Sequence, residues 1–178
     1  MTTPATADLL LRPVTEADAP AILEAFDDPL MSRQGTVTDL AQAQAYAARL
    51  ARNDYAFALD SGGRFAGVAV IDVDAEHSLG WFWYWVCRDF RRRGLASTAA
   101  RSLANWALTD GGLYRLELGH RVNNPASGAV ARAAGFIREG VEREKFLVGG
   151  QRVDVFTYGR LASDPIPDGP TCPIRRGA

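Results

Sequence analysis

Cysteine is scarce in this chain, and so is any excess of charge of one sign. Only Cys87 and Cys172 occur among 178 residues, too few for a disulfide framework, and neither has neighbours at a metal-ligand spacing. The formal net charge is −1 at pH 7, so no global field draws the chain to nucleic acid or to an anionic membrane. We therefore expect no metal site, no nucleic-acid partner and no membrane partner.

Long apolar runs are also missing. No stretch approaches the roughly 20 apolar residues that span a bilayer. Residues 1–8 show no basic region followed by an apolar stretch, so we expect no signal peptide and a cytoplasmic location. The hydrophobic fraction of 47% and the charged fraction of 23% are typical of a globular domain with an ordinary core.

The hydrophobic periodicity predicts a strand, two helices, three strands, a helix, a strand, a helix and two strands. This order indicates an α/β single domain built on one central sheet. We expect the domain to cover residues 1–161, and residues 162–178, with four prolines, to form an extended or mobile tail. The predicted strands cover 9–11, 55–59, 65–73, 81–86, 113–118, 136–144 and 152–161, and the predicted helices begin at Thr15, Thr38, Gly94 and Asn124.

The densest apolar stretch is the aromatic run 81–86, with sequence WFWYWV. Both alternating faces of this run are large and apolar, which predicts a central strand covered on both sides. We interpret its aromatic side chains as core.

The segment 88–97 carries the chemistry. A buried strand ends there, a loop with four arginines turns, and a helix begins near Gly94. Free N–H groups and the positive end of the helix dipole form an anion site at such a helix start. Gly94 and Ala96 are small and let a phosphate approach the backbone. The alternative interpretation is a solvated arginine run in front of an ordinary amphipathic helix.

Four motifs together resemble a known family. The run Arg91–Ala96 resembles the Arg/Gln-x-x-Gly-x-Gly/Ala signature of the GNAT superfamily of N-acetyltransferases. Three others are similar to the branch that acetylates the N-termini of ribosomal proteins (RimJ/RimL-like). These are Leu11–Pro13 with Asp18-Ala19, Asn124–Ser127, and Ala134–Phe136 with Glu139-Gly140. The resemblance covers residues 8–161, in the same order and spacing.

The resemblance implies a GNAT fold, with a mixed, mostly antiparallel sheet of about seven strands and about four helices. It also implies acetyl-CoA, or another short acyl-CoA such as succinyl-CoA, as co-substrate in an opening between the two central strands. A bulge in the strand that ends at Val86 would leave an amide free to polarise the thioester carbonyl. The implied cofactor-binding residues are Trp85, Val86, Arg88, Arg91, Arg92, Arg93, Gly94, Leu95, Ala96, Ser97, Asn124 and Ser127.

The resemblance nominates Ser127 as the acid that protonates the departing thiolate, although Asn124, Pro125 and Ser127 also suit an ordinary helix start. The position at which relatives carry a glutamate base falls on Lys145 here. Its neighbour Glu144 is the nearest carboxylate, on the opposite face if the strand is regular. Other candidate bases are Glu76, His77, Glu117 and His120.

Cys87 allows a second route, through an acyl-cysteine, but the resemblance favours direct transfer. We expect the acceptor pocket to form from residues 27–36 and the last hairpin. Asp27 and Asp28 are candidates to attract an amine, and Tyr46 and the tryptophans are candidates to line an apolar wall.

The predicted function is N-acyl transfer to a primary amine, either a protein N-terminus or a small molecule. The alternatives are a non-catalytic acyl-CoA sensor on the same scaffold and a phosphate-binding module that uses only the loop at 91–96. Pairing with a second copy of the chain, to form a homodimer, is a further possibility.

Overall fold

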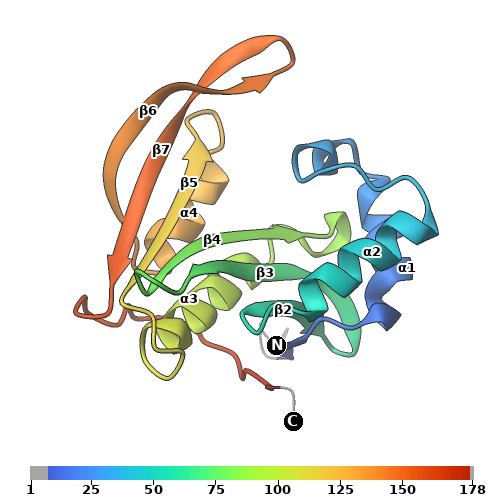
Figure 1. The fold of residues 1–178 in the computed structure, drawn as a ribbon, viewed down its shortest axis with the longest axis horizontal. Helices are drawn as coiled ribbons and strands as arrows, with labels where there is room; N and C mark the ends of the chain where they lie inside the picture. The colour runs from blue at the N-terminus through green and yellow to red at the C-terminus, as the bar shows by residue number, and fades with distance from the viewer. Residues whose placement is uncertain (1–7, 177–178) are drawn as a thin grey trace, which may run out of the picture.

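A computed structural model describes residues 8–176 as one seven-stranded sheet with helices on both faces (Figure 1). The strand order is β1-β2-β3-β4-β5-β7-β6, and all neighbours are antiparallel except β4 and β5. The fold class expected from the sequence is therefore confirmed. The strands are β1 (Leu9–Pro13), β2 (Ala56–Ser61), β3 (Arg64–Asp74), β4 (Leu79–Val86), β5 (Arg115–Arg121), β6 (Ile137–Val148) and β7 (Gln151–Leu161).

Four α-helices and three short 3₁₀ helices connect these strands. The α-helices are α1 (Ala19–Phe26), α2 (Leu40–Ala51), α3 (Leu95–Leu108) and α4 (Pro125–Ala133). The 3₁₀ helices are η1 (Glu16–Asp18), η2 (Pro29–Arg33) and η3 (Arg88–Phe90). None of the helices within residues 8–176 is long and apolar enough to cross a membrane.

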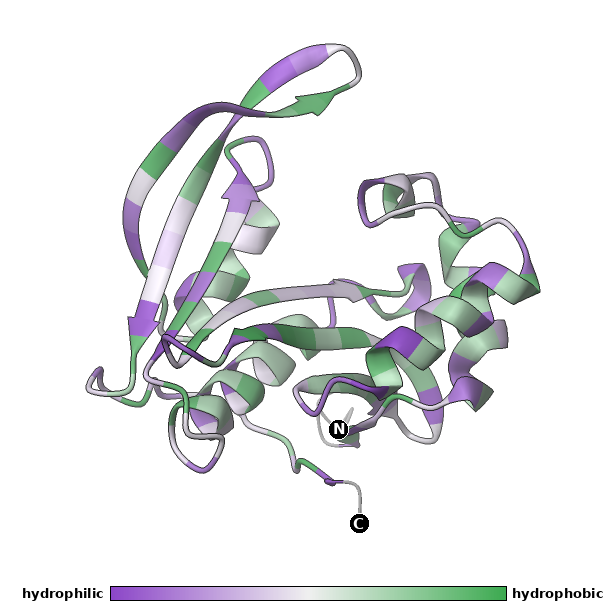
Figure 2. Cartoon of the chain, viewed as in Figure 1, coloured by the Kyte–Doolittle hydropathy of each residue, from purple (hydrophilic) through white to green (hydrophobic). Residues whose placement is uncertain are grey.

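The apolar faces of the helices form two cores, one on each side of the sheet. Helices α1 and α2 bury Ile22, Ala43 and Leu50 against residues of β2, β3 and β4. Helix α3 buries Leu95, Ala99 and Leu103 against the opposite face of the sheet, where α4 also packs. In Figure 2, β3 is largely green, as a central strand should be, whereas the β6–β7 hairpin mixes green with purple.

Two local expectations need correction. Helix α2 is capped by Asp39, whose carboxylate accepts the Gln42 N–H over 2.8 Å, and not by Thr38. Strand β4 is not covered on both sides along its whole length. Trp85 is 4% exposed, but Trp81 is 37% exposed, because the core beneath α1 and α2 includes Trp85 at the end of β4 and does not extend to Trp81 near its start.

Within residues 162–176 the tail runs without helix and is anchored to the domain by hydrogen bonds. The Leu11 N–H donates to the Pro173 carbonyl over 3.0 Å, and the Arg175 N–H donates to the Leu11 carbonyl over 2.7 Å. Ser102 of α3 accepts the backbone N–H of Cys172, whose side chain is 9% exposed. The tail therefore covers the free edge of β1 and part of α3.

Candidate active site

Strands β4 and β5 separate soon after they begin. Their parallel pairing is confined to Leu79–Trp81 opposite Arg115–Glu117. Beyond Trp81, β4 continues to Val86 in contact with β3 alone, and β5 turns away toward the β6–β7 hairpin (Figure 1). The edge of β4 that faces β5 thus loses its neighbouring strand over residues 82–86.

The pairing with β3 fixes which backbone groups line this edge. The Cys87 N–H donates to the Ala66 carbonyl over 2.9 Å, so the N–H groups of alternate residues, including Trp85, also point to β3. The backbone groups of Tyr84 and Val86 therefore point toward the opening. An extended ligand with amide groups can pair with this edge as a further strand would.

Two expectations about β4 are wrong. The register between β3 and β4 is regular from Leu79 to Val86, so no bulge interrupts β4. An amide is free at this edge because β5 diverges, which makes a bulge unnecessary. The second is the contact expected between Trp85 and the ligand. The backbone N–H and carbonyl groups of Trp85 point to β3 and are not available to a ligand in the opening. Its indole N–H donates to the Tyr46 hydroxyl over 3.0 Å, inside the core beneath α1 and α2.

The start of α3 provides unpaired N–H groups beside the end of β4. Gly94 is the N-cap with φ +80° and has no side chain to cap the helix. The first intrahelical bond runs from the Thr98 N–H to the Gly94 carbonyl, so the N–H groups of residues 95–97 have no helical acceptor. Arg92 also has a positive φ of 60°, which turns the loop around this point. The site fits a diphosphate, because several donors and the helix dipole point at one place.

The four loop arginines divide into two pairs. Arg92 and Arg93 are exposed, and the Arg93 guanidinium lies 5.4 Å from the centre of the Phe90 ring. Arg88 and Arg91 turn instead to Asp28, with N–O distances of 3.3 and 2.7 Å. We expected Asp28 to attract a cationic amine, but its charge is already compensated by these arginines. The prediction for Asp28 is therefore wrong, whereas Asp27 is exposed beside it.

Ser127 lies in the first turn of α4, next to a residue of β4. Asn124 caps the helix, and its side-chain oxygen accepts the Ser127 N–H over 3.4 Å. The Tyr84 hydroxyl donates to Ser127 Oγ over 3.3 Å. Burial raises the pKa of the Tyr84 hydroxyl, and the hydrogen bond to Ser127 opposes that rise. Sequence reasoning treated Tyr84 as core and missed this contact, although its alternation with Trp85 was visible.

The two histidines and Glu117 are engaged elsewhere. His120 is 6% exposed, with Nδ1 2.9 Å from the Arg121 carbonyl oxygen and Nε2 3.3 Å from the Tyr158 hydroxyl. His77 pairs with Asp74 in the exposed β3–β4 turn, beside Glu76 and at the end where β4 and β5 are still paired. Glu117 is bound by Arg115 at 2.8 Å. These contacts indicate structural roles.

The β6 bulge changes the argument about Glu144 and Lys145. The register between β6 and β7 shifts between Glu142 and Phe146, and Glu144 has a φ of 54°. Simple alternation of faces therefore does not apply here. The Glu144 N–H donates to Asp154 over 2.8 Å, and its side chain is exposed. Lys145 Nζ bonds Glu142 over 2.5 Å and lies 5.6 Å from the Trp81 ring centre, so Glu142 and Lys145 face β4.

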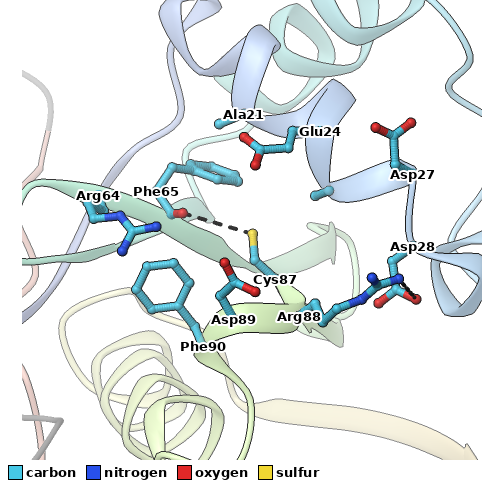
Figure 3. A pocket seen from close by; sticks show the side chains of 11 residues that line it. Ala21, Glu24, Asp27, Asp28, Arg64, Phe65, Cys87, Arg88, Asp89 and Phe90 are labelled. Atoms are coloured by element: carbon cyan, nitrogen blue, oxygen red, sulfur yellow. Dashed lines mark hydrogen bonds and ion pairs between the residues drawn. The ribbon is translucent and has the colours of Figure 1, made fainter.

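Cys87 borders a cavity of about 270 Å³ between α1 and the end of β4 (Figure 3). Its thiol lies 3.9 Å from the Phe65 carbonyl oxygen. Burial raises the pKa of Cys87 to about 11, so the thiol stays protonated at neutral pH and is a poor nucleophile.

Residues 8–176 contain no group of three or more His, Cys, Asp or Glu side chains that could hold a metal ion.

Comparison with known proteins agrees with this geometry. Residues 8–137 match the family described as acetyltransferase (GNAT) domain. A stretch of 78 residues, 44% of this chain, is 32% identical to YdaF of Bacillus subtilis, which is assigned by name to the ribosomal N-acetyltransferases. That stretch covers 43% of YdaF. Over 78 residues the chain is also 32% identical to the ribosomal-protein-serine acetyltransferase of Escherichia coli, covering 44% of each protein. The matched segment thus spans less than half of each relative.

A solved structure shows the same fold. The complex of RimL, a ribosomal L7/L12 alpha-N-protein acetyltransferase, with coenzyme A superposes with a TM-score of 0.78. The alignment covers 89% of this chain and 96% of that chain at 24% identity. The resemblance to the RimJ/RimL-like branch is confirmed, and the chain belongs to the acetyltransferase (GNAT) domain family.

Proposed function

We propose that this protein transfers an acetyl group from acetyl-CoA to a primary amine. One observation carries the proposal. The free edge of β4 at Tyr84 and Val86 leads directly into the loop whose helix start presents the N–H groups of residues 95–97. An amide-containing arm next to a diphosphate is the chemistry of coenzyme A, and GNAT acetyltransferases use acetyl-CoA.

The residues of the site then take distinct tasks. The N–H groups of Leu95, Ala96 and Ser97 would hold the diphosphate, with Arg92 and Arg93 adding positive charge beside it. The Leu95 side chain itself is buried in the core, so only its backbone takes part. The backbone of Tyr84 and Val86 would pair with the pantetheine arm, and a fixed N–H donor on this edge would polarise the thioester carbonyl.

The departing thiolate needs a proton, and we propose Ser127 as the residue that gives it. Ser127 can pass on its hydroxyl proton while it accepts one from the Tyr84 hydroxyl, because Tyr84 already donates to Ser127 Oγ. Tyr84 would then regain a proton through water from the amine nitrogen, which loses one as the amide forms, so both hydroxyls end the reaction protonated. This role is a proposal that rests on the contact across the opening.

The acceptor amine must be uncharged to attack. An α-amine has a pKa of about 8 and a lysine of about 10.4, so only the α-amine is substantially neutral near pH 7. Ser127, Tyr84 and the β4 edge provide no evident strong base. We therefore favour an α-amine, such as a protein N-terminus, as acceptor, with Glu144 or Glu142 assisting through a water. The ribosomal-protein acetyltransferases among the relatives act on proteins, which supports this choice.

Release of free coenzyme A thiol tests the proposal. The purified protein would be given acetyl-CoA or succinyl-CoA and a panel of acceptors that pairs each N-terminal peptide with its N-blocked form carrying a lysine. We expect thiol release with acetyl-CoA and free α-amines, at rates well above the blocked peptides. Tight binding of acetyl-CoA without release across the panel would instead identify a sensor.

A further inference from the structure

Asp28 sits between the first helix and the loop that follows β4. It comes two residues after α1 and is the N-cap of η2, where its Oδ1 accepts the Leu30 N–H over 3.1 Å. The residue is 7% exposed. A buried aspartate is costly unless its charge is paired, so its partners decide what it does.

Both charged partners of Asp28 come from the phosphate loop, residues 87–94. Arg91 Nη2 lies 2.7 Å from Oδ2, and Arg88 Nη2 lies 3.3 Å from Oδ1. The Arg91 contact is an ion pair rather than an aligned hydrogen bond. The same guanidinium donates through Nε to the Val86 carbonyl over 2.9 Å. Arg91 thus joins the last residue of β4 to Asp28.

The phosphate loop needs such a restraint. Arg92 adopts φ 60°, a left-handed conformation that costs a non-glycine residue about 1–2 kcal/mol. Gly94 follows at φ 80°. Phe90 is buried and Cys87 is partly buried at the start of the loop, but Arg92, Arg93 and Gly94 are exposed and provide no apolar anchor. The Asp28–Arg91–Val86 chain of contacts holds the loop just before the strained residue.

We propose that Asp28 is a positioning residue for the acyl donor. It holds the phosphate loop in the conformation that presents the N–H groups of residues 95–97 to a diphosphate, and it links this loop to η2. The inference rests on the proposed function, since it assumes that the loop binds acetyl-CoA. Figure 1 shows the η2 segment on the far side of the opening from the β6–β7 hairpin, so the link reaches from the donor site toward the expected acceptor side.

The proposal predicts a sign opposite to that of simple electrostatics. Asp28 adds a negative charge near a site for a diphosphate, so removing that charge should strengthen binding if charge alone mattered. If Asp28 positions the loop, its removal weakens binding instead.

The test compares Asp28→Asn with Asp27→Asn. Both substitutions remove one negative charge, but Asp27 is exposed and its neighbour is buried between the arginines. Each variant is titrated with acetyl-CoA by calorimetry. Its kcat/KM is then measured with acetyl-CoA and with S-acetylpantetheine, which lacks the diphosphate. We expect Asp28→Asn to weaken acetyl-CoA binding about tenfold and to leave kcat/KM with S-acetylpantetheine within about twofold. Asp27 remains a candidate only for contact with the acceptor, so Asp27→Asn should leave the affinity for acetyl-CoA in calorimetry unchanged or slightly higher.

The outcomes separate this inference from the proposed function. If the wild-type protein binds no acetyl-CoA, the proposed function fails. If the wild-type protein binds acetyl-CoA and Asp28→Asn binds it as tightly, the positioning role is wrong. The role is also wrong if Asp28→Asn lowers kcat/KM equally with acetyl-CoA and with S-acetylpantetheine. Should Asp28→Asn fail to fold, Arg91→Lys serves instead. It keeps the positive charge but cannot contact Val86 and Asp28 together, so we expect the same selective loss. Unchanged acetyl-CoA binding in that variant would contradict the proposal.

Discussion

The Tyr84 hydroxyl donates a hydrogen bond to Ser127 Oγ over 3.3 Å and so joins β4 to the first turn of α4. The contact spans the point where β4 and β5 have separated. It places a phenol behind the serine that is proposed to protonate the thiolate. A serine alone is a weak acid, and a donor at its back allows it to give up a proton without becoming an alkoxide.

We expect Tyr84→Phe to lower kcat about fivefold while acetyl-CoA affinity stays within about twofold, the loss that one hydrogen bond of about 1 kcal/mol implies. Because burial raises the Tyr84 pKa above its usual value near 10, the hydroxyl remains protonated through neutral pH. The wild-type pH profile should therefore show no fall caused by Tyr84 below about pH 10. An unchanged kcat in Tyr84→Phe would return Tyr84 to a purely packing role.

Ser127→Ala should lower kcat by about 100-fold, the lower range for loss of a general acid, with acetyl-CoA affinity nearly unchanged. Ser127→Thr keeps a hydroxyl and is the matched control, which we expect to retain most of the activity. Steady-state kinetics and calorimetry on the same preparations measure both quantities. Wild-type turnover in Ser127→Ala would remove serine from the reaction.

Gly94→Glu should abolish acetyl-CoA binding without unfolding the domain, because a carboxylate would occupy the place of the phosphate. Gly112, just after the other end of α3, provides the control. It has φ +75° and open space around it, so Gly112→Glu carries similar backbone strain far from the phosphate loop. Calorimetry should show loss of binding only for Gly94→Glu. Equal affinities in the two variants would contradict the position of the diphosphate.

The ion pairs of Asp28 make a prediction about stability and pH. Burial raises the pKa of Asp28, but the Leu30 N–H, Arg88 and Arg91 lower it more, so the folded-state pKa lies below the usual value of 3.8. The resulting stabilisation is present above that value and is lost as pH falls through the folded-state pKa. Urea unfolding at several pH values should show the stability gap between wild type and Asp28→Asn shrinking below about pH 4. A gap that is constant from pH 7 to pH 3 would contradict the ion pairs.

The anchored tail predicts a loss of stability on truncation. Ending the chain after residue 168 removes the contacts with Leu11 and Ser102 and uncovers the β1 edge. A few hydrogen bonds and one buried side chain suggest a loss of about 2–4 kcal/mol in the free energy of unfolding. Ending it after residue 176 keeps those contacts and is the control. Identical chemical denaturation curves for the two truncations would show that the tail does not stabilise the domain.

The sequence predicts the strands, the helices and the anion site at Gly94, because these follow from local periodicity and helix-start chemistry. It does not settle which side of β4 faces the opening. Neighbouring residues point to opposite edges, and only pairing with β3 decides that Tyr84 and Val86 are the pair exposed there. The resemblance selected Val86 together with Trp85, whose backbone pairs with β3, and did not select Tyr84.

The missed relationships all join parts of the chain that are distant in sequence. Asp28 contacts arginines about sixty residues later, and Leu11 meets the tail. No local pattern marks such pairs. At Glu144 the difficulty is different, since the β6 bulge cancels the strand alternation on which the sequence argument depended. Whether Glu144 acts as a base stays a prediction.

A crystal structure with acetyl-CoA tests the central claim most directly. We expect the diphosphate oxygens within hydrogen-bonding distance of the N–H groups of Leu95, Ala96 and Ser97. The pantetheine amides should pair with the β4 edge at Tyr84 and Val86. A cofactor bound elsewhere, with the start of α3 closed by side chains, would contradict the account.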